Sequence, residues 1–330
     1  MNVCILGTSN GIISDGYVKA IKKCSDFSSI RNLSLGASSC AFFPYRLNEI
    51  DWENTDLIFV ESLVNDAASA RAGAFDFTDI RLYYEDLIYQ CFMHEVQLVC
   101  IVLPGRTKDA YYDSCIALLR DVLIEYNVTI WDIEKNIESH CLANQIGYMD
   151  LYRDAAHPHS WFLYEVSAGL LSKEFKPTVP SFKKDEFEQI KFTSITDPNF
   201  TFELDDLDFK VINTSLLSAE TKVIPKNICL EFKLNFEFLL YAFVLNSNNT
   251  NCVAEINGVN TTKKSFAFEL KENNDKIIVS PLFDSVSSLN KKINLKVIND
   301  SDFSQKSYQA NSPLIFESKL ELVGLIYKKS

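Results

Sequence analysis

The 330-residue sequence has few of the basic side chains and long apolar runs that mark several classes of protein. Its 32 Lys and Arg residues are outnumbered by 44 Asp and Glu residues, giving a formal net charge of −12. Nucleic acids and anionic membrane surfaces are recognised by clustered basic side chains, so this balance disfavours both partners. No apolar run approaches the roughly 20 residues of a membrane-spanning helix, and we therefore expect no membrane insertion.

Targeting and disulfide signals are also scarce. The N-terminus shows no basic segment followed by a long apolar core, so no secretory signal is expected. The nine cysteines are an odd number and form no CxxC pair, which favours buried or free thiols over a disulfide framework. Together these features predict a cytoplasmic protein, and they leave its oligomeric state undetermined.

The first half of the chain shows a regular alternation of two patterns. Three longer segments, 79–92, 109–126 and 159–171, have apolar residues at three- and four-residue spacing and are predicted helices. Short apolar runs, predicted as strands, lie among them: Val3–Leu6, Leu33–Leu35, Leu57–Val60, Leu98–Leu103 and Val128–Trp131. This alternation predicts an α/β domain over residues 1–176, a parallel sheet with helices on both faces.

The second half has a different texture. Residues 177–194 carry Pro177 and Pro180 among charged side chains, a composition typical of a linker. From 195 to 330, apolar and polar residues alternate, as in 228–245 and 318–327, and clusters of Asn, Asp and Ser separate the alternating segments. This pattern predicts an all-β, sandwich-like accessory domain at 195–330.

The stretch "ILGTSNGIISDGY", residues 5–17, follows the first predicted strand and raises a choice between two kinds of site. A phosphate-binding loop needs GxGxxG or GxxxxGK[ST], and the spacing of Gly7, Gly11 and Gly16 fits neither pattern. The other candidate is Ser9 as a nucleophile, which needs a base to take its proton. Without such partners, Ser9 would be an ordinary N-cap of the helix that follows.

Partners for Ser9 occur further along the chain. His157 follows Asp154 by three residues, a spacing at which the carboxylate can fix the imidazole tautomer. Gly36 and Asn65 follow the second and third predicted strands, and their N–H groups could stabilise an oxyanion. Each has an alternative role: Asp154 and Asn65 could cap helices, and Gly36 could be only a turn residue.

Two further candidates concern metal and substrate. Asp154, His157 and His159 form an Asp-x-x-His-x-His cluster, but no other ligand stands at a recognisable spacing, so no metal site is expected. Arg71 lies in the segment 67–77, which could form a wall of the pocket. Its guanidinium could bind a polar or acidic group of a substrate or simply be solvated.

Four segments, taken in order, resemble the sequence blocks of the SGNH (GDSL-type) hydrolase family. They are "GTSN" with Ser9, "LGASS" with Gly36, "ESLVND" with Asn65, and Asp154-x-x-His157-Pro158. The resemblance covers residues 1 to about 175. Two positions depart from the family pattern: Thr8 stands where many members have Asp, and the third block lacks its usual glycine.

The resemblance implies a three-layer α/β/α domain with about five parallel strands and neither metal nor organic cofactor. It implies that Ser9 attacks an ester carbonyl, that His157 acts as base and then acid, and that Asp154 orients His157. The oxyanion hole would comprise the N–H groups of Ser9 and Gly36 and the Asn65 side chain.

The function expected from the resemblance is a serine ester hydrolase that removes acetyl or another small acyl group. The expected partner is an acylated carbohydrate or other small ester. Two alternatives remain open. One is an O-acyltransferase that uses the same triad on a polysaccharide or sugar, and the other is a non-catalytic glycan-binding protein.

Overall fold

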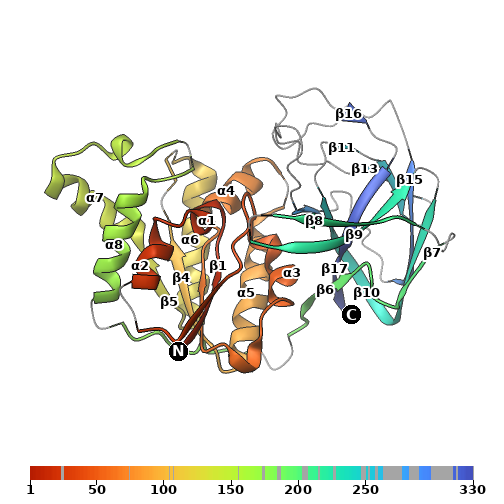
Figure 1. The fold of residues 1–330 in the computed structure, drawn as a ribbon, viewed down its shortest axis with the longest axis horizontal. Coiled ribbons are helices and arrows are strands. Elements are labelled where there is room, and N and C mark those ends of the chain that lie inside the picture. Colours follow the sequence, from red (N-terminus) through yellow and green to blue (C-terminus); the bar gives the residue numbers. More distant parts are fainter. Residues whose placement is uncertain are drawn as a thin grey trace. The chain divides into compact units, whose positions relative to one another are not determined.

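The chain divides into two compact units, Met1–Asp185 and Glu186–Ser330, in a computed structural model (Figure 1). The structure describes residues 1–23, 26–73, 75–103, 105–106, 108–154, 156–172, 175–183, 187–202, 207–214, 216–225, 228–246, 250–251, 253–256, 259–262, 277–281, 290–298, 315–316 and 319–329. The division falls inside the expected linker 177–194. Both ends of that segment are structured: Thr178 pairs with Leu98 of the first unit, and residues 190–194 form a strand of the second unit.

The first unit is built on a five-stranded parallel sheet with the order β2-β1-β3-β4-β5. Helices cover both of its faces, so the expected three-layer α/β/α arrangement is confirmed. The strands are β1 (Asn2–Leu6), β2 (Ser29–Asn32), β3 (Leu57–Val60), β4 (Gln97–Val102) and β5 (Thr129–Asp132). The helices are α1 (Ser9–Ile12), α2 (Tyr17–Lys23), α3 (Phe43–Leu47), α4 (Leu63–Arg71), α5 (Phe77–Met93), α6 (Ala110–Glu125), α7 (Ile133–Asn144) and α8 (Ser160–Ser172), with 3₁₀ turns at Cys40–Phe42, Trp52–Asn54 and Tyr148–Leu151.

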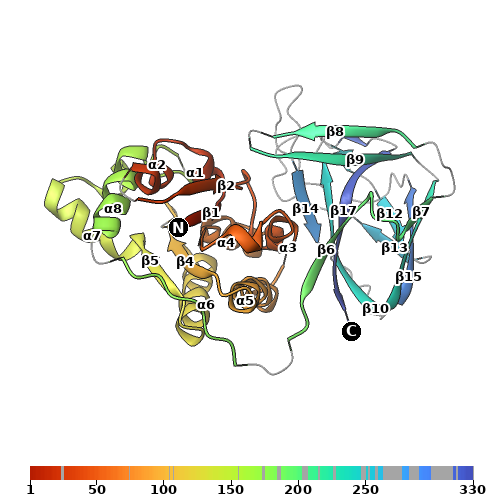
Figure 2. The same cartoon turned by 60° about the horizontal axis from the view of Figure 1, so that its bottom comes forward.

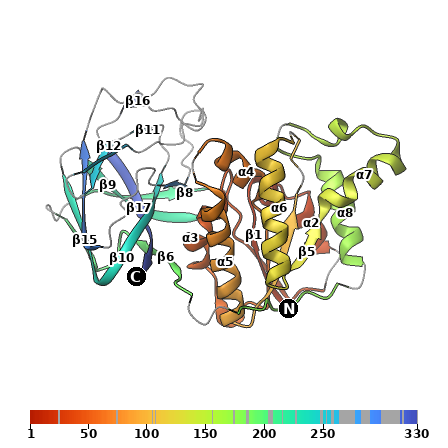
Figure 3. The same cartoon turned by 180° about the vertical axis from the view of Figure 1, so that it is seen from behind.

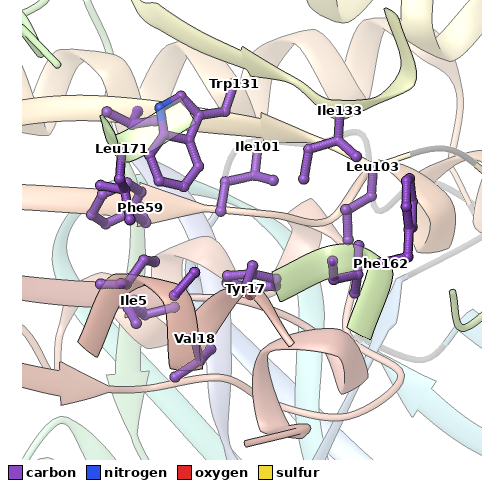
Figure 4. Packing of buried hydrophobic residues seen from close by; sticks show 14 of the residues in the cluster. Ile5, Tyr17, Val18, Phe59, Ile101, Leu103, Trp131, Ile133, Phe162 and Leu171 are labelled. Atoms are coloured by element: carbon purple, nitrogen blue, oxygen red, sulfur yellow. The ribbon is translucent and has the colours of Figure 1, made fainter. Parts of the chain in front are cut away.

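Burial of both sheet faces explains why the central strands are continuous apolar runs. Side chains alternate between the faces along a strand. One set packs under α2 and α8, where Phe59, Ile101 and Trp131 of the strands meet Tyr17 and Phe162 of the helices (Figure 4). Figure 2 shows α2 and α8 on one side of the sheet and α5 and α6 on the other, and Figure 3 shows α5 and α6 from behind.

One predicted strand is misplaced. The apolar run Leu33–Leu35 was expected to form the second strand, but β2 spans Ser29–Asn32. It is an edge strand whose residues are exposed or partly exposed, so no apolar run marks it. The N–H groups of Leu33 and Leu35 still bond to the carbonyls of Ile5 and Gly7, which leads the chain along β1 toward the carboxyl edge of the sheet.

Local signals fix the ends of the long helices. Asp76 and Asp79 form a reciprocal capping box at the start of α5, each carboxylate accepting the other's backbone N–H. Asp109 caps α6 by accepting the Tyr112 N–H at 3.0 Å. The apolar periodicity at 79–92 and 109–126 predicted both helices to within about two residues at each end, and the caps fix where the helices begin.

The second unit is an antiparallel β domain, as the alternating pattern predicts. Its main sheet has the strand path β13-β12-β15-β10-β17-β9-β8, with β14, β6 and β7 paired to members of that path. The strands are β6 (Ile190–Ser194), β7 (Phe200–Phe202), β8 (Phe209–Asn213), β9 (Ser218–Pro225), β10 (Cys229–Asn246), β12 (Val253–Ile256), β13 (Val259–Thr262), β14 (Ile277–Pro281), β15 (Asn290–Ile298) and β17 (Lys319–Lys329), and β11 (Thr250–Asn251) pairs separately with β16 (Ile315–Phe316).

The long strand β10 organises this second unit. Its first part pairs with β15 and β7, and after a register irregularity between Lys233 and Phe238 its second part pairs with β17 and β14. A strand that changes partners in this way continues from one part of the sheet into another. Phe232 and Phe238 pack edge to face at 5.2 Å at this change of partners.

Candidate active site

The candidate site lies at the carboxyl edge of the parallel sheet. From β1 the chain crosses to β2 on one side of it, and from β3 it crosses to β4 on the other side. The connections that leave the neighbouring strands β1 and β3 therefore run in opposite directions along this edge. Such a switch point opens a crevice outside the carboxyl ends of the strands. Ser9 comes three residues after β1 ends at Leu6, and Glu61 comes directly after β3 ends at Val60.

Ser9, His157 and Asp154 form a continuous hydrogen-bonded chain. The Ser9 Oγ lies 2.6 Å from His157 Nε2, and His157 Nδ1 lies 2.7 and 2.9 Å from the two Asp154 oxygens. An ionised carboxylate only accepts hydrogen bonds, so Nδ1 must carry the ring proton. The lone pair of Nε2 then faces the serine hydroxyl, which is the arrangement a general base requires.

The loop that carries Asp154 and His157 is held by its own backbone. Asp154 Oδ1 accepts the N–H groups of Ala156 and His157 at 3.0 and 2.9 Å. Tyr152 and Pro158 form an antiparallel bridge that closes the loop. The Asp154 and His157 side chains are 48% and 21% exposed, so the imidazole is the better shielded of the two.

The Asp154 carboxylate is favoured over its acid form. Partial burial is the largest influence and acts to raise its pKa. The hydrogen bonds from Ala156 and from the His157 ring and backbone together outweigh burial, so the pKa of Asp154 lies below its ordinary value. The carboxylate therefore persists through the range in which imidazoles titrate.

Ser9 occupies a different helical position from the one an N-cap would take. Thr8 is the N-cap residue of α1, and Ser9 is the first residue of that helix. The Ser9 hydroxyl points to His157 instead of to a backbone N–H. The next residue, Asn10, is buried, and its side-chain amide donates to the Ala156 carbonyl at 3.4 Å, which links α1 to the histidine loop.

Gly36 and Asn65 are tied to the same turn. Gly36 lies in the turn Leu35–Ser38, which is closed by the Ser38 N–H and hydroxyl donating to the Leu35 carbonyl. The Asn65 Nδ2 donates to the Ser38 carbonyl at 2.7 Å. A primary amide has two N–H donors, so Asn65 retains a second one beyond this bond. Whether these groups face an oxyanion stays a prediction.

Two buried carboxyl groups, Glu61 and Asp66, stand at the two ends of the segment "ESLVND", and the sequence pattern gave neither of them a role in the site. Asp66 accepts the Cys40 N–H at 2.7 Å and the hydroxyls of Ser62 and Tyr84 at 2.8 and 3.1 Å. Burial raises its pKa to about 6, with these hydrogen bonds opposing the rise. Glu61 accepts both the N–H and the hydroxyl of Thr8, at 3.1 and 2.9 Å. An acid at the end of an all-apolar strand was the available signal for Glu61.

Arg71 and His159, the candidates for substrate and metal binding, both contact other side chains of the first unit. Arg71, at the end of α4, is 43% exposed and forms an ion pair with Asp109, the N-cap of α6, at 2.5 Å. The His159 ring stacks on Trp161. Over the part of the chain that the structure describes, no group of three or more His, Cys, Asp or Glu side chains is placed to hold a metal ion. None of the described helices combines the length and apolar character of a membrane span.

Comparison with known proteins gives a likeness in fold. No protein-family model matches the chain, and no curated protein matches it in sequence. A solved two-domain esterase active on acetylated mannans, co-crystallised with mannopentaose, superposes with a TM-score of 0.66 at 14% identity, over 100% of this chain and 90% of its own. This likeness shows that the chain has the two-domain fold of that structure.

Other solved structures match about half of the chain with lower scores. An acetylxylan esterase from Geobacillus stearothermophilus has a TM-score of 0.44 at 12% identity, over 53% of this chain and 94% of its own. A member of the lipolytic protein G-D-S-L family from Veillonella parvula has a TM-score of 0.41 at 16% identity, over 51% of this chain and 94% of its own.

Proposed function

We propose that this chain is a serine ester hydrolase of the SGNH type that removes an acetyl or other small acyl group from a carbohydrate. The observation that carries the proposal is the chain of contacts from Ser9 Oγ through His157 to Asp154. The order of the four sequence blocks supports it. The two-domain fold shared with an esterase active on acetylated mannans supports the carbohydrate substrate.

The chemistry follows from the roles that these contacts permit. Ser9 Oγ attacks the ester carbonyl carbon while its proton passes to His157 Nε2. His157 then gives that proton to the leaving alcohol oxygen, and the acyl group remains on Ser9. In the second half, water attacks the acyl carbonyl and His157 accepts one water proton. The carboxylic acid leaves as that proton returns to Ser9 Oγ, and the released acid then ionises in solvent.

Negative charge develops on the carbonyl oxygen in both halves. The Ser9 N–H, the Gly36 N–H and the second N–H of the Asn65 amide are the proposed donors to it. A single donor of this kind is worth about 10²–10³ in kcat. Asp154 stabilises the imidazolium that forms after each proton transfer to His157, because its carboxylate remains ionised beside Nδ1.

The decisive experiment compares wild type and Ser9→Ala with p-nitrophenyl acetate and a panel of acetylated mannan, xylan and monosaccharide esters. Turnover by wild type that Ser9→Ala abolishes is the expected result. Equal turnover by both proteins would remove the nucleophile assignment. Each donor is also tested with a deacetylated saccharide acceptor: acyl transfer to the acceptor in place of acetate release would assign the alternative, an O-acyltransferase.

A further inference from the structure

Glu61 and Thr8 form a contact that the proposed reaction does not use. Glu61 follows β3 and Thr8 follows β1, so the contact joins the carboxyl ends of two neighbouring parallel strands. A single oxygen, Glu61 Oε2, accepts the Thr8 N–H at 3.1 Å and the Thr8 hydroxyl at 2.9 Å. The Glu61 N–H donates to the Leu6 carbonyl at 3.0 Å, so the two chain segments are linked on both sides of Gly7.

Both residues are almost fully shielded from solvent, with exposed fractions of 1% each. A buried carboxyl group is costly unless hydrogen bonds compensate it. In the part of the chain that the structure describes, the second oxygen, Oε1, is buried without a hydrogen-bond partner. The hydrogen bonds from Thr8 are therefore the main compensation for the free-energy cost of burying Glu61. A carboxyl group that is buried at this cost points to a role beyond packing.

The environment of Glu61 is acidic as well as buried. Burial raises the pKa of Glu61 to about 7, the two hydrogen bonds from Thr8 act against the rise, and the nearby Asp66 carboxyl adds to it. Burial is the largest cause of the raised pKa values of Tyr17 and Cys100, and the charge of Glu61 in turn contributes to both.

Thr8 sets the start of the helix that carries Ser9. Its carbonyl accepts the N–H groups of Gly11 and Ile12 at 3.0 and 3.2 Å, which begins α1. A threonine at an N-cap ordinarily uses its hydroxyl to accept a backbone N–H of the first turn. Among the described residues, the Thr8 side chain makes no such cap; its hydroxyl donates to Glu61 instead. Glu61 thus fixes the residue directly before Ser9 through both its backbone and its side chain.

We propose that Glu61 is a positioning residue for the Ser9 nucleophile, acting through Thr8. This inference rests on the proposed esterase function. Glu61 holds the Thr8 N–H and hydroxyl, Thr8 fixes the first turn of α1, and that turn places Ser9 Oγ against His157 Nε2. A displacement of Ser9 by about 1 Å can cost on the order of 10²-fold in rate, so removal of this anchor acts on kcat and leaves substrate binding intact.

Three substitutions test the anchor with p-nitrophenyl acetate. Glu61→Ala removes the acceptor, and we expect kcat to fall by about 10- to 100-fold with KM within about twofold of wild type. Glu61→Gln keeps an acceptor oxygen of the same reach, and we expect its kcat within about threefold of wild type. Thr8→Val removes only the hydroxyl donor, so an intermediate loss in kcat of about fivefold is expected.

A matched control separates positioning from general destabilisation. Glu85 of α5 is also a buried carboxylate, and it accepts hydrogen bonds from Arg81 and Tyr126. It lies on a helix that carries none of the proposed catalytic residues. Glu85→Gln is expected to lower the melting temperature and to leave kcat unchanged.

The outcomes separate this inference from the proposed function. Wild-type turnover that Ser9→Ala abolishes establishes the reaction first, and its absence would be a failure of the proposed function. Given that turnover, the anchor is disproved by any of three results: Thr8→Val with wild-type kcat, Glu61→Gln as impaired as Glu61→Ala, or a loss that appears in KM instead of kcat. If Glu61→Ala does not fold, the Thr8→Val and Glu61→Gln comparison alone decides.

Discussion

Ser9 Oγ lies 2.6 Å from His157 Nε2, although 148 positions of sequence separate the two residues. The short connection after β1 delivers the serine, and a self-bonded loop before α8 delivers the histidine. The parallel sheet brings both segments to one edge. In the proposed mechanism the two side chains act as one unit, so the rate depends on both.

That interdependence gives the first prediction. Ser9→Ala and His157→Ala are each expected to lower kcat by at least about 10³-fold. The double variant is expected to lose no more than either single variant, because removing the base disables the nucleophile as fully as removing the nucleophile itself. Melting temperatures should stay close to that of wild type. Stepwise, multiplicative losses in the three variants would show that the residues act independently.

Asp154 gives a second prediction. Asp154→Asn keeps the size of the side chain but replaces an acceptor-only group with an amide that can donate to Nδ1. The imidazole would then favour the wrong tautomer, so we expect kcat to fall by about 10²–10⁴-fold. The kcat of Asp154→Asn is measured across pH 5 to 9. Recovery of wild-type activity at any pH in that range would contradict the orienting role.

The proposed oxyanion donors give a third prediction, in which two substitutions should differ. Asn65→Ala removes a side-chain donor and is expected to lower kcat by about 10²-fold with little change in KM. Gly36→Ala keeps the backbone N–H, and its new Cβ would meet only the Ile12 Cδ1 at 3.4 Å, an ordinary contact. We expect Gly36→Ala to cost less than about tenfold. Equal losses would argue against the backbone donor at Gly36.

A fourth prediction concerns the pH dependence of stability. The pKa of Glu61 is about 7 in the folded chain and near 4.5 ordinarily. Between these values the unfolded chain is ionised at Glu61 while the folded chain keeps the proton, so the contribution of Glu61 to stability is fully present below pH 4.5 and is lost as pH rises through 7. The loss is on the order of 3 kcal/mol in the free energy of unfolding.

Glu61→Gln should remove that slope, because glutamine does not titrate. The melting temperatures of wild type and Glu61→Gln are therefore expected to be close at pH 5 and to diverge in favour of Gln by pH 8. Asp66, whose pKa is raised to about 6, is present in both proteins, so the difference between the two curves reports the titration of Glu61 and its interaction with Asp66. Parallel curves would show that Glu61 titrates at its ordinary pKa.

A fifth prediction tests the packing under the nucleophile turn. A Cβ at Gly11 would overlap the Ser34 side chain and the buried Tyr17 hydroxyl. Gly11→Ala is therefore expected to reduce the free energy of unfolding by about 2 kcal/mol or more. Gly169 in α8 has no neighbour within 4 Å of such a Cβ, so Gly169→Ala should be stabilising by about 0.5–1 kcal/mol. Urea unfolding measures both, and a tolerated Gly11→Ala would contradict the overlap.

Most of the first unit could be predicted from the sequence because its signals are local. A strand buried on both faces must be apolar almost throughout, and this located β1, β3 and β4. The edge strand β5 is mostly only partly buried, and its apolar residues Ile130 and Trp131 located it. The edge strand β2 lacks that requirement and was misplaced by several residues. The segments 228–245 and 318–327 correspond to β10 and β17. In the first part of β10, one covered face imposes a period of two, whereas residues 321–327 of β17 are buried throughout.

The candidate site was predictable to the extent that its chemistry is written in short motifs. The spacing Asp154-x-x-His157 is local, and the pairing of the Asp154 carboxylate with the imidazole was expected from it. Glu61 and its contacts with Thr8 were not expected, because no motif marks a pair 53 positions apart. Arg71 was expected to be either solvated or bound to substrate, and its partner Asp109 was equally invisible in the sequence.

The sequence by itself determined the residue types and their order. In the first half, helices alternate with apolar strands; in the second half, strands have alternating apolar and polar residues. The sequence also placed a serine, a glycine, an asparagine and an Asp-x-x-His pair in order along the first half. Spacing carries this information because backbone periodicity and hydrogen bonding act over a few residues. Only the tertiary structure decided which of these groups meet. Contacts between Ser9 and His157 or between Thr8 and Glu61 depend on strand order, since parallel pairing brings residues distant in sequence to one edge of the sheet.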